Sequence, residues 1–210
     1  MAGRKDRIVT EETIRIREKK KALRREIISR SLSLPKEYRE KADPMIFQNL
    51  LSLPEYQNAR TVFCFVGVEH EINTRPFLQC VINDGKRLTV PLCTGRGIME
   101  ARRIFSLAEL KRGYYGLFEP DKDSPEIPME EVDFAVIACV TADHNGNRLG
   151  HGGGYHDILF NQYPDIPAAV ICREKIITDK IPLESFDHQF PMTVTECGIH
   201  RLSKQSSDQQ

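Results

Sequence analysis

Hydrophobic positions in the first quarter of the chain follow helical spacing. From about residue 11 to residue 33 the sequence contains strong helix formers and no Gly or Pro. Four apolar residues fall on one stripe at spacings of seven, four and seven, namely Ile16, Leu23, Ile27 and Leu34. This pattern predicts a long N-terminal amphipathic helix that ends near Pro35. A second helix is predicted from Lys36 to Leu51, with four buried residues, Tyr38, Met45, Ile46 and Leu50.

After Pro54 the pattern changes to short apolar runs that alternate with helical segments. The runs predict strands at residues 61–66, 87–90, 99–104, 133–140 and 168–172. Helices are expected between the strands, at residues 74–82, 106–111 and 155–163. A stretch rich in Pro, Asp and Ser predicts an exposed loop at residues 120–128. This alternation indicates an α/β fold with a mixed, mainly parallel sheet flanked by helices.

Length and charge limit the possible classes of protein. The chain has 210 residues, which suits one domain over residues 1–202, followed by a polar tail at residues 203–210 that we expect to be disordered. Lys and Arg together number 30, as do Asp and Glu, so no overall field favours binding to nucleic acid or to a membrane. No apolar run approaches the roughly 20 residues of a membrane helix. We therefore expect a monomer that acts on small molecules.

The cysteines and the N-terminal segment indicate the cytoplasm. Six cysteines are scattered along the chain without the close spacing of a zinc or redox pair, and we expect buried thiols in a reducing compartment. Residues 1–14 are too charged for a signal peptide. Acidic residues interrupt the basic ones there, which disfavours a mitochondrial presequence.

A glycine-rich loop is the strongest candidate for chemistry. Gly150, Gly152, Gly153 and Gly154 lie between a predicted buried strand and a predicted helix. Without Cβ atoms, their backbone N–H groups can approach an anion closely. The loop matches neither the P-loop pattern nor the dinucleotide fingerprint, and glycine runs also serve as plain turns. Phosphate binding is the favoured interpretation and a structural turn is the alternative.

Charged residues near this loop have two interpretations each. Asp157, in the first turn of the following helix, either complements the helix dipole or binds Mg²⁺ beside a phosphate. Lys20 falls inside the apolar stripe of the first helix, and Arg24 follows one turn later. Either the Lys20 stem packs while its ammonium reaches water, or both cations face a polyphosphate. Glu71, beyond the first strand, either faces a ligand or caps a helix together with Thr74.

Four segments in the same order resemble the 5-formyltetrahydrofolate cyclo-ligases, also called 5,10-methenyltetrahydrofolate synthetases. Residues 146–157, Gly-Asn-Arg-Leu-Gly-His-Gly-Gly-Gly-Tyr-His-Asp, are similar to the family's Gly-x-Arg-Leu-Gly-Arg-Gly-x-Gly-Tyr-Tyr-Asp. Residues 20–24 resemble its Lys-x-x-Leu-Arg, residues 71–74 its Glu-Ile-x-Thr, and residues 115–120 its Tyr-Gly-Ile-x-Glu-Pro. The resemblance extends from about residue 19 to residue 196.

The resemblance implies ATP-dependent cyclisation of 5-formyltetrahydrofolate to 5,10-methenyltetrahydrofolate, with Mg²⁺ as a requirement. Asp157 would bind Mg²⁺, and Val66, Glu71 and Tyr155 would contact the folate. Lys20, Arg24, Arg148 and Tyr155 are the implied catalytic residues. The implied ATP-binding residues are Lys20, Arg24, Arg148, Leu149, Gly150, His151, Gly152, Gly153, Gly154, Tyr155 and His156.

Three positions depart from the family pattern. His151 replaces an Arg, so we expect a titratable group at the phosphates and nucleotide affinity that strengthens as the pH falls from roughly 8 to 6. His156 replaces a Tyr, and Pro191 replaces an aspartate that binds metal in the family, with Asp187 as a possible substitute. A non-catalytic nucleotide- or folate-binding homologue is therefore an alternative. A weaker alternative is an RNA-binding module that uses the basic first helix, although stacking aromatic residues are scarce there.

Overall fold

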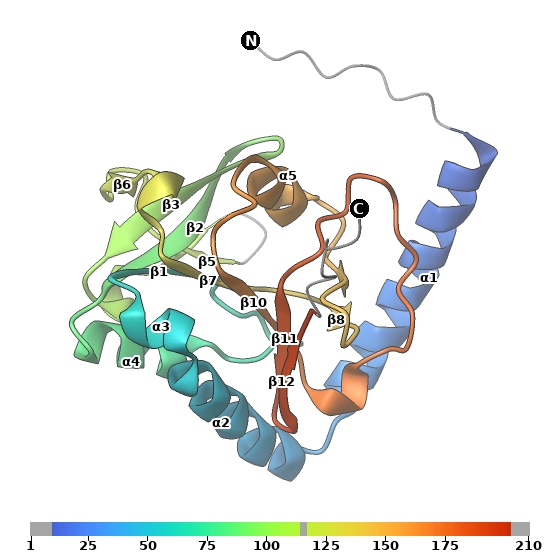
Figure 1. Ribbon diagram of the computed structural model, residues 1–210, viewed down its shortest axis with the longest axis horizontal. Helices are drawn as coiled ribbons and strands as arrows, with labels where there is room; N and C mark the ends of the chain where they lie inside the picture. The colour runs from blue at the N-terminus through green and yellow to red at the C-terminus, as the bar shows by residue number, and fades with distance from the viewer. Residues whose placement is uncertain (1–9, 114–116, 203–210) are drawn as a thin grey trace, which may run out of the picture.

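The computed structural model describes residues 10–113 and 117–202 (Figure 1). The predicted tail at residues 203–210 and part of the motif at residues 115–120 lie outside the described residues. Within them, no helix combines the length and the apolar character that crossing a membrane would require.

Two long helices open the described chain, as the sequence predicted. Helix α1 (Glu11–Leu32) is capped by Thr10, whose hydroxyl accepts a hydrogen bond from the Thr13 N–H at 3.2 Å. Helix α2 (Lys36–Ser52) follows after a short turn. Of the predicted core residues of α2, Ile46 and Leu50 are fully buried, but Met45 is 47% exposed. The prediction for Met45 was wrong because its neighbours in α2 face the sheet and Met45 points to solvent.

An eight-stranded sheet forms the centre of the molecule. Its order is β12 (Gly198–Arg201), β11 (Met192–Thr195), β10 (Ala168–Ile171), β7 (Phe134–Ile137), β1 (Thr61–Cys64), β2 (Arg87–Gly95), β3 (Ile98–Ile104) and β6 (Glu126–Ile127). The pairs between β11 and β2 are parallel, and the pairs at both edges are antiparallel. The predicted mixed, mainly parallel sheet is therefore confirmed.

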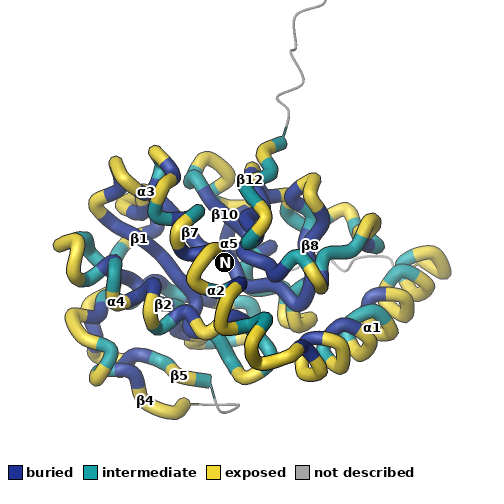
Figure 2. The backbone as a smooth tube through the Cα atoms, turned by 90° about the horizontal axis from the view of Figure 1, so that it is seen from below, coloured by how far each residue is buried: buried dark blue, intermediate teal, exposed yellow. Residues whose placement is uncertain are grey.

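Helices cover the two faces of the sheet, and the strands alternate accordingly. Val62 and Cys64 of β1 pack in the hydrophobic cluster beneath α2, α3 (Pro54–Asn58) and α4 (Arg75–Asn83). Phe63, between them, packs in the opposite cluster with residues of α1 and α5 (Tyr155–Gln162). The buried strands thus form a central layer between helices (Figures 1 and 2).

Short strands and turns account for most differences from the predicted elements. The expected helix at residues 106–111 is a 3₁₀ turn, η1 (Leu107–Glu109), followed by β4 (Lys111–Arg112), which pairs with β5 (Phe118–Glu119). The expected loop at residues 120–128 includes β6, which pairs with β3. Strands β11 and β12 were not predicted, nor was the hairpin of β8 (Thr141–Ala142) and β9 (Arg148–Leu149). The remaining turns are η3 (Met129–Glu131) and η4 (Glu174–Ile176).

The sheet changes its winding direction next to β1. From β1 the chain proceeds through α4 to β2 on one side, whereas β7, β10 and β11 lie on the other. In open α/β sheets, ligands bind at the carboxyl ends of the strands where such a change occurs. The segments that follow β1, β7 and β10 therefore form the expected position of a site.

Candidate active site

A tight turn positions the start of the glycine-rich loop. The carboxylate of Asp143, which is 4% exposed, accepts hydrogen bonds from the Asn145 N–H at 2.9 Å and the Asn147 N–H at 3.0 Å. Gly146 has a φ of 78°, a conformation that residues with a Cβ atom rarely adopt. Its carbonyl accepts from the Phe190 N–H at 2.9 Å, so the turn is fixed against the C-terminal part of the chain.

The glycine-rich loop presents unused backbone donors at the start of α5. Gly152 and Gly154 have φ values of 103° and 71°. Among the described residues, the N–H groups of residues 151–157 make no hydrogen bond, and the first such bond in α5 runs from the Ile158 N–H to the Gly154 carbonyl at 2.9 Å. Free N–H groups at a helix N-terminus form an anion-binding arrangement. The geometry therefore favours the phosphate-binding interpretation.

Arg148 and Asp157 form a buried ion pair beneath this loop. An Nη atom of Arg148 donates to Asp157 Oδ1 at 3.0 Å, and the two side chains are 3% and 12% exposed. The His188 N–H also donates to Asp157 Oδ1, at 3.3 Å. Asp157 therefore carries a specific partner in addition to its position on the helix dipole. Its Oδ2 atom accepts no hydrogen bond from the residues that the structure describes.

Helix α1 brings two cations to the edge of the glycine-rich loop. The Lys20 side chain is 6% exposed, and its Nζ lies 2.5 Å from Asp187 Oδ2 and 3.4 Å from Glu184 Oε1. Arg24 Nε donates to the carbonyl of Gly150 at 2.6 Å. Burial lowers the pKa of Arg24, although nearby Asp187, Glu184 and Asp157 oppose the shift. The interpretation in which the Lys20 ammonium reaches water is therefore wrong.

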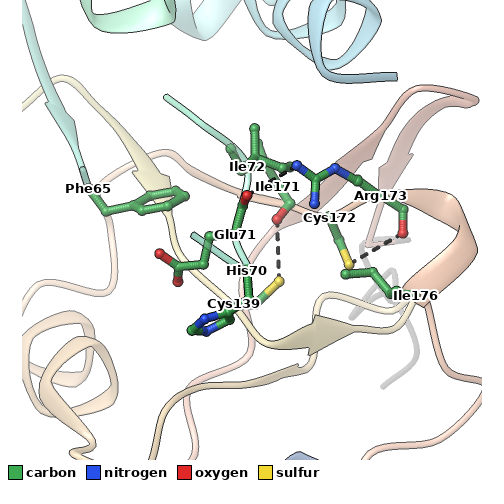
Figure 3. A pocket seen from close by; sticks show the side chains of 9 residues that line it. All are labelled: Phe65, His70, Glu71, Ile72, Cys139, Ile171, Cys172, Arg173 and Ile176. Carbon is green, nitrogen blue, oxygen red and sulfur yellow. Dashed lines mark hydrogen bonds between the residues drawn. The ribbon is translucent and has the colours of Figure 1, made fainter. Parts of the chain in front are cut away.

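A narrow pocket opens at the carboxyl ends of the central strands (Figure 3). Its cavity volume of about 10 Å³ has room for roughly one water molecule. The pocket is lined by Phe65, His70, Glu71, Ile72, Cys139, Ile171, Cys172, Arg173 and Ile176. A pterin ring is far larger, so this conformation of the pocket is closed to a folate.

Glu71 is the buried acid of the pocket. Its side chain is 6% exposed, and the Val68 N–H donates to Glu71 Oε2 at 2.9 Å. Burial raises the pKa of Glu71 to about 7, and the bond from Val68 opposes this rise. The alternative role in helix capping with Thr74 is wrong, because Thr74 Oγ1 instead donates to the Phe65 carbonyl at 2.8 Å and accepts from the Gly67 N–H at 3.0 Å.

The pKa values of the two histidines of the motif are both lowered in this arrangement. His151 Nε2 lies 2.8 Å from His70 Nε2 and 3.5 Å from Glu71 Oε1. Burial, followed by the nearby His70, Arg148 and Arg24, lowers the pKa of His151 to about 4. Burial also lowers the pKa of His156, whose Nε2 is buried without a hydrogen bond from the described residues. This lowered pKa belongs to the ligand-free protein, so the expected strengthening of nucleotide affinity as the pH falls from roughly 8 to 6 stays a prediction.

The structure separates the remaining predicted residues into site and core. Leu149 is 1% exposed in β9 and Val66 is 8% exposed in the core, while the adjacent Phe65 lines the pocket. Tyr155 is half-buried at the start of α5. Pro191 is exposed, and its predicted place in a changed metal site stays a prediction, as do the ligand contacts of Val66 and Tyr155.

Sequence reasoning missed Arg173 as a residue of the pocket. Its guanidinium is bound by Asp43 at 2.7 and 2.9 Å and donates to the Glu71 carbonyl at 3.1 Å. A cation directly after the buried strand at residues 168–172 was the signal that could have revealed it.

Comparisons with known proteins agree on one family. The model of the 5-formyltetrahydrofolate cyclo-ligase family matches residues 16–196. A probable 5-formyltetrahydrofolate cyclo-ligase of Schizosaccharomyces pombe is 26% identical over 71% of this chain and 81% of the relative. The 5-formyltetrahydrofolate cyclo-ligase of Escherichia coli K12 is 24% identical over 82% of this chain and 98% of the relative.

A solved structure leads to the same family. The NMR structure of Aquifex aeolicus 5,10-methenyltetrahydrofolate synthetase shares 27% identity and a TM-score of 0.80, over 91% of this chain and 96% of the other. The resemblance inferred from the motifs is thus confirmed. The chain belongs to the 5-formyltetrahydrofolate cyclo-ligase family.

Proposed function

We propose that the chain catalyses the ATP-dependent cyclisation of 5-formyltetrahydrofolate to 5,10-methenyltetrahydrofolate, with release of ADP and phosphate. Membership of the family supports this activity, and ATP is the co-substrate that the family uses. The observation that carries the proposal is the cradle of free N–H groups at residues 151–157, next to the Glu71 pocket.

The reaction requires two bond-forming steps at neighbouring positions. The formyl oxygen attacks the γ-phosphorus of ATP and ADP leaves. Then N10 attacks the formyl carbon and loses its proton to solvent, and the phosphorylated oxygen leaves as phosphate. Phosphoryl transfer depends on positioning and charge neutralisation more than on a nucleophilic side chain. Residues 151–157 and the cations Lys20 and Arg24 would hold the phosphates, while Val66, Glu71 and Tyr155 would contact the folate.

The acids that now neutralise the cations suggest how ATP enters the site. Lys20 is paired with Asp187, and Arg148 with Asp157. Phosphate oxygens would replace Asp187 at Lys20, and this would release the Asp187 carboxylate where a phosphate-bound cation would lie. This exchange keeps the buried charges compensated in both states.

Mg²⁺ fits the donor set near the loop. Asp157 offers a hard carboxylate oxygen, Oδ2, which accepts no hydrogen bond within the described chain, and hard oxygen ligands are those that Mg²⁺ prefers. Asp157 would hold the ion, with Asp187 as a second candidate once Lys20 has turned to phosphate. The ion would supply charge neutralisation to the phosphates.

Folate entry requires an opening of the pocket. His70, which lines the pocket, contacts His151 of the glycine-rich loop at 2.8 Å, and the cavity of about 10 Å³ cannot contain a pterin. We infer that the segment at residues 67–72 or the glycine-rich loop moves when substrate binds. Both are irregular segments at the strand ends, where such movements are common.

We further infer a monomer in the cytoplasm that binds neither nucleic acid nor a membrane. The exposed large apolar side chains are distributed over several helices, strands and loops, among them Ile14, Met45, Ile98 and Leu183. Scattered apolar residues of this kind do not require a partner. All six cysteines are free thiols, which suits a reducing compartment.

The direct test is formation of the methenyl chromophore from purified protein, 5-formyltetrahydrofolate, Mg²⁺ and ATP. We expect product with ATP and none without it. ATP binding without product would instead support the non-catalytic homologue, the alternative favoured by the changes at His151, His156 and Pro191. A Lys20→Ala variant of this assay tests the cation at the loop. Lys21→Ala is its control, because Lys21 is exposed on the same turn of α1 as Lys20.

A further inference from the structure

Two histidines and a glutamate form a cluster outside the candidate active site. His144 lies in the turn between β8 and β9, Glu174 starts η4, and His200 lies in β12. One possible ligand atom from each residue lies within 4.8 Å of the other two. The three residues come from segments that are far apart in the sequence, so the fold itself assembles the cluster.

The contacts within this cluster leave two buried atoms without hydrogen bonds. His144 Nε2 lies 3.1 Å from Glu174 Oε1, and the rings of His144 and His200 stack with centroids 3.9 Å apart and planes at 16°. Glu174 Oε2 and His200 Nε2 are buried and make no hydrogen bond within the part of the chain that the structure describes. Buried polar atoms of this kind are rare and usually indicate a bound ion or water.

We propose that His144, Glu174 and His200 bind Zn²⁺. Two imidazoles and one carboxylate are a ligand set of this ion, and a fourth position remains open for water. Ligands at about 2.0–2.1 Å in a tetrahedron lie roughly 3.3 Å apart. The contact of 3.1 Å between His144 and Glu174 fits this spacing. Rotation of His144 and Glu174, whose side chains are 42% and 31% exposed, can unstack the His144 ring from His200 and bring both ligand atoms to this spacing from His200.

The ligand chemistry separates this site from the nucleotide site. Mg²⁺ requires hard oxygen ligands, so it would prefer ATP and Asp157 to a pair of imidazoles. A second histidine pair, His70 and His151, lies near Glu71 at the edge of the pocket. Zinc binding by that pair is the competing outcome, and the experiment must distinguish the two.

The test is a Zn²⁺ titration of the full-length, tag-free protein by calorimetry, with His144→Gln and His200→Gln as variants and His70→Gln as the matched control. We expect one ion per chain with a Kd below about 10 µM. Each of the first two variants should weaken binding more than about 100-fold, whereas His70→Gln should leave the affinity unchanged.

Two results would overturn the proposal. One is wild-type protein that does not bind Zn²⁺ below about 100 µM. The other is loss of binding in His70→Gln with retention in His144→Gln, which would place zinc in the pocket. Circular dichroism checks the fold of every variant, and His144→Gln carries the test if His200→Gln does not fold, because His144 is on an exposed turn. As a second measurement, Co²⁺ should give the visible absorption of a tetrahedral site with wild type and not with Glu174→Gln.

Discussion

The site's cations Lys20 and Arg148 are each paired with an acid, and this pairing decides what a substitution would measure. Lys20 contacts Asp187 and Glu184, and Arg148 contacts Asp157. Removing one member of a buried pair leaves an uncompensated charge, so stability falls even where catalysis is unaffected. Ligand affinities must therefore be compared with the free energy of unfolding for every variant of these residues.

The first prediction concerns Lys20. We expect Lys20→Ala to weaken ATP binding by about tenfold or more and folate binding much less, because a cation that can bind phosphate is lost. Lys20→Arg should restore ATP binding only in part, since the guanidinium differs in shape from the ammonium. Affinities are measured by calorimetry with each ligand separately. Equal losses for both ligands, or the same losses in Lys21→Ala, would mean that Lys20 acts only through packing and the ion pair with Asp187.

The second prediction concerns Asp157. We expect Asp157→Asn to lower turnover at least about 100-fold while ATP still binds, because a neutral amide cannot compensate charge as the phosphoryl group transfers. The asparagine oxygen can still accept from Arg148, which limits the loss of stability. Initial rates are measured across a range of Mg²⁺ concentrations. Unchanged turnover at limiting Mg²⁺ would show that Asp157 has only the structural role of pairing with Arg148.

At the scale of residues, the sequence predicted the charged groups better than their partners. Glu71 and Asp157 were identified from their places at a strand end and in a helix start after the glycine-rich loop, and Arg148 from the family resemblance. Asp187 was considered only as a metal ligand, yet it binds Lys20 from a position 167 residues away. A pairing of this kind depends on the tertiary path of the chain, which local patterns do not contain.

At the scale of elements, long periodic segments were predicted well and short strands were not. Helix α1 (Glu11–Leu32) matches the predicted bounds within about one residue, because its composition is uniform over several turns. Strands β8 and β9 contain two residues each, which is too short for any period to show. Strand β11 follows Pro191, a residue that disfavours strand pairing, and its pairing with β10 was therefore missed.

The third prediction concerns the turn between β8 and β9. A Cβ atom at Gly146 would lie 1.9 Å from the Phe190 carbonyl, in addition to the strain of a φ of 78°. We expect Gly146→Ala to destabilise the protein by about 2 kcal/mol or more, measured by urea unfolding. Gly85→Ala is the control, because Gly85 has a similar φ of 71° and open space around it. Equal destabilisation by the two variants would show that the contact with Phe190 adds nothing to backbone strain.

At the scale of the whole molecule, buried titratable groups in the site link stability to pH in opposite directions. The pKa of Glu71 is raised to about 7, so its contribution is present below its ordinary pKa and is lost as the pH rises toward 7. The pKa values of His151 and His156 are lowered, so the unfolded chain takes up protons there as the pH falls below about 6.5 while the native site does not. The closed, desolvated site therefore costs stability at both ends of this range.

The fourth prediction is a maximum of stability near pH 6.5. Between about pH 4.5 and 6.5 the unfolded state holds two more protons on His151 and His156, and the native state holds one more on Glu71. The net of one proton from these three groups raises the free energy of unfolding by about 1.4 kcal/mol per pH unit, and less where the partly exposed His151 titrates more freely. The lowered pKa values of His70 and His188 act in the same direction. From pH 6.5 to 7 only Glu71 contributes, and stability declines slightly.

Urea unfolding from pH 5 to 8 measures this profile. Two variants separate the rise in stability up to pH 6.5, here called the acid limb, from the decline above it. His156→Phe removes one buried imidazole and should make the acid limb shallower. The difference in bound protons between the unfolded and the native state is then smaller by one. Glu71→Gln should abolish the decline above pH 6.5 and make the acid limb steeper, since the native state no longer holds the opposing proton. If both variants kept the wild-type profile, the pH dependence would arise outside the site. In that case the burial of Glu71 and His156 would be relieved by solvent that enters the pocket, and the pocket would open without substrate.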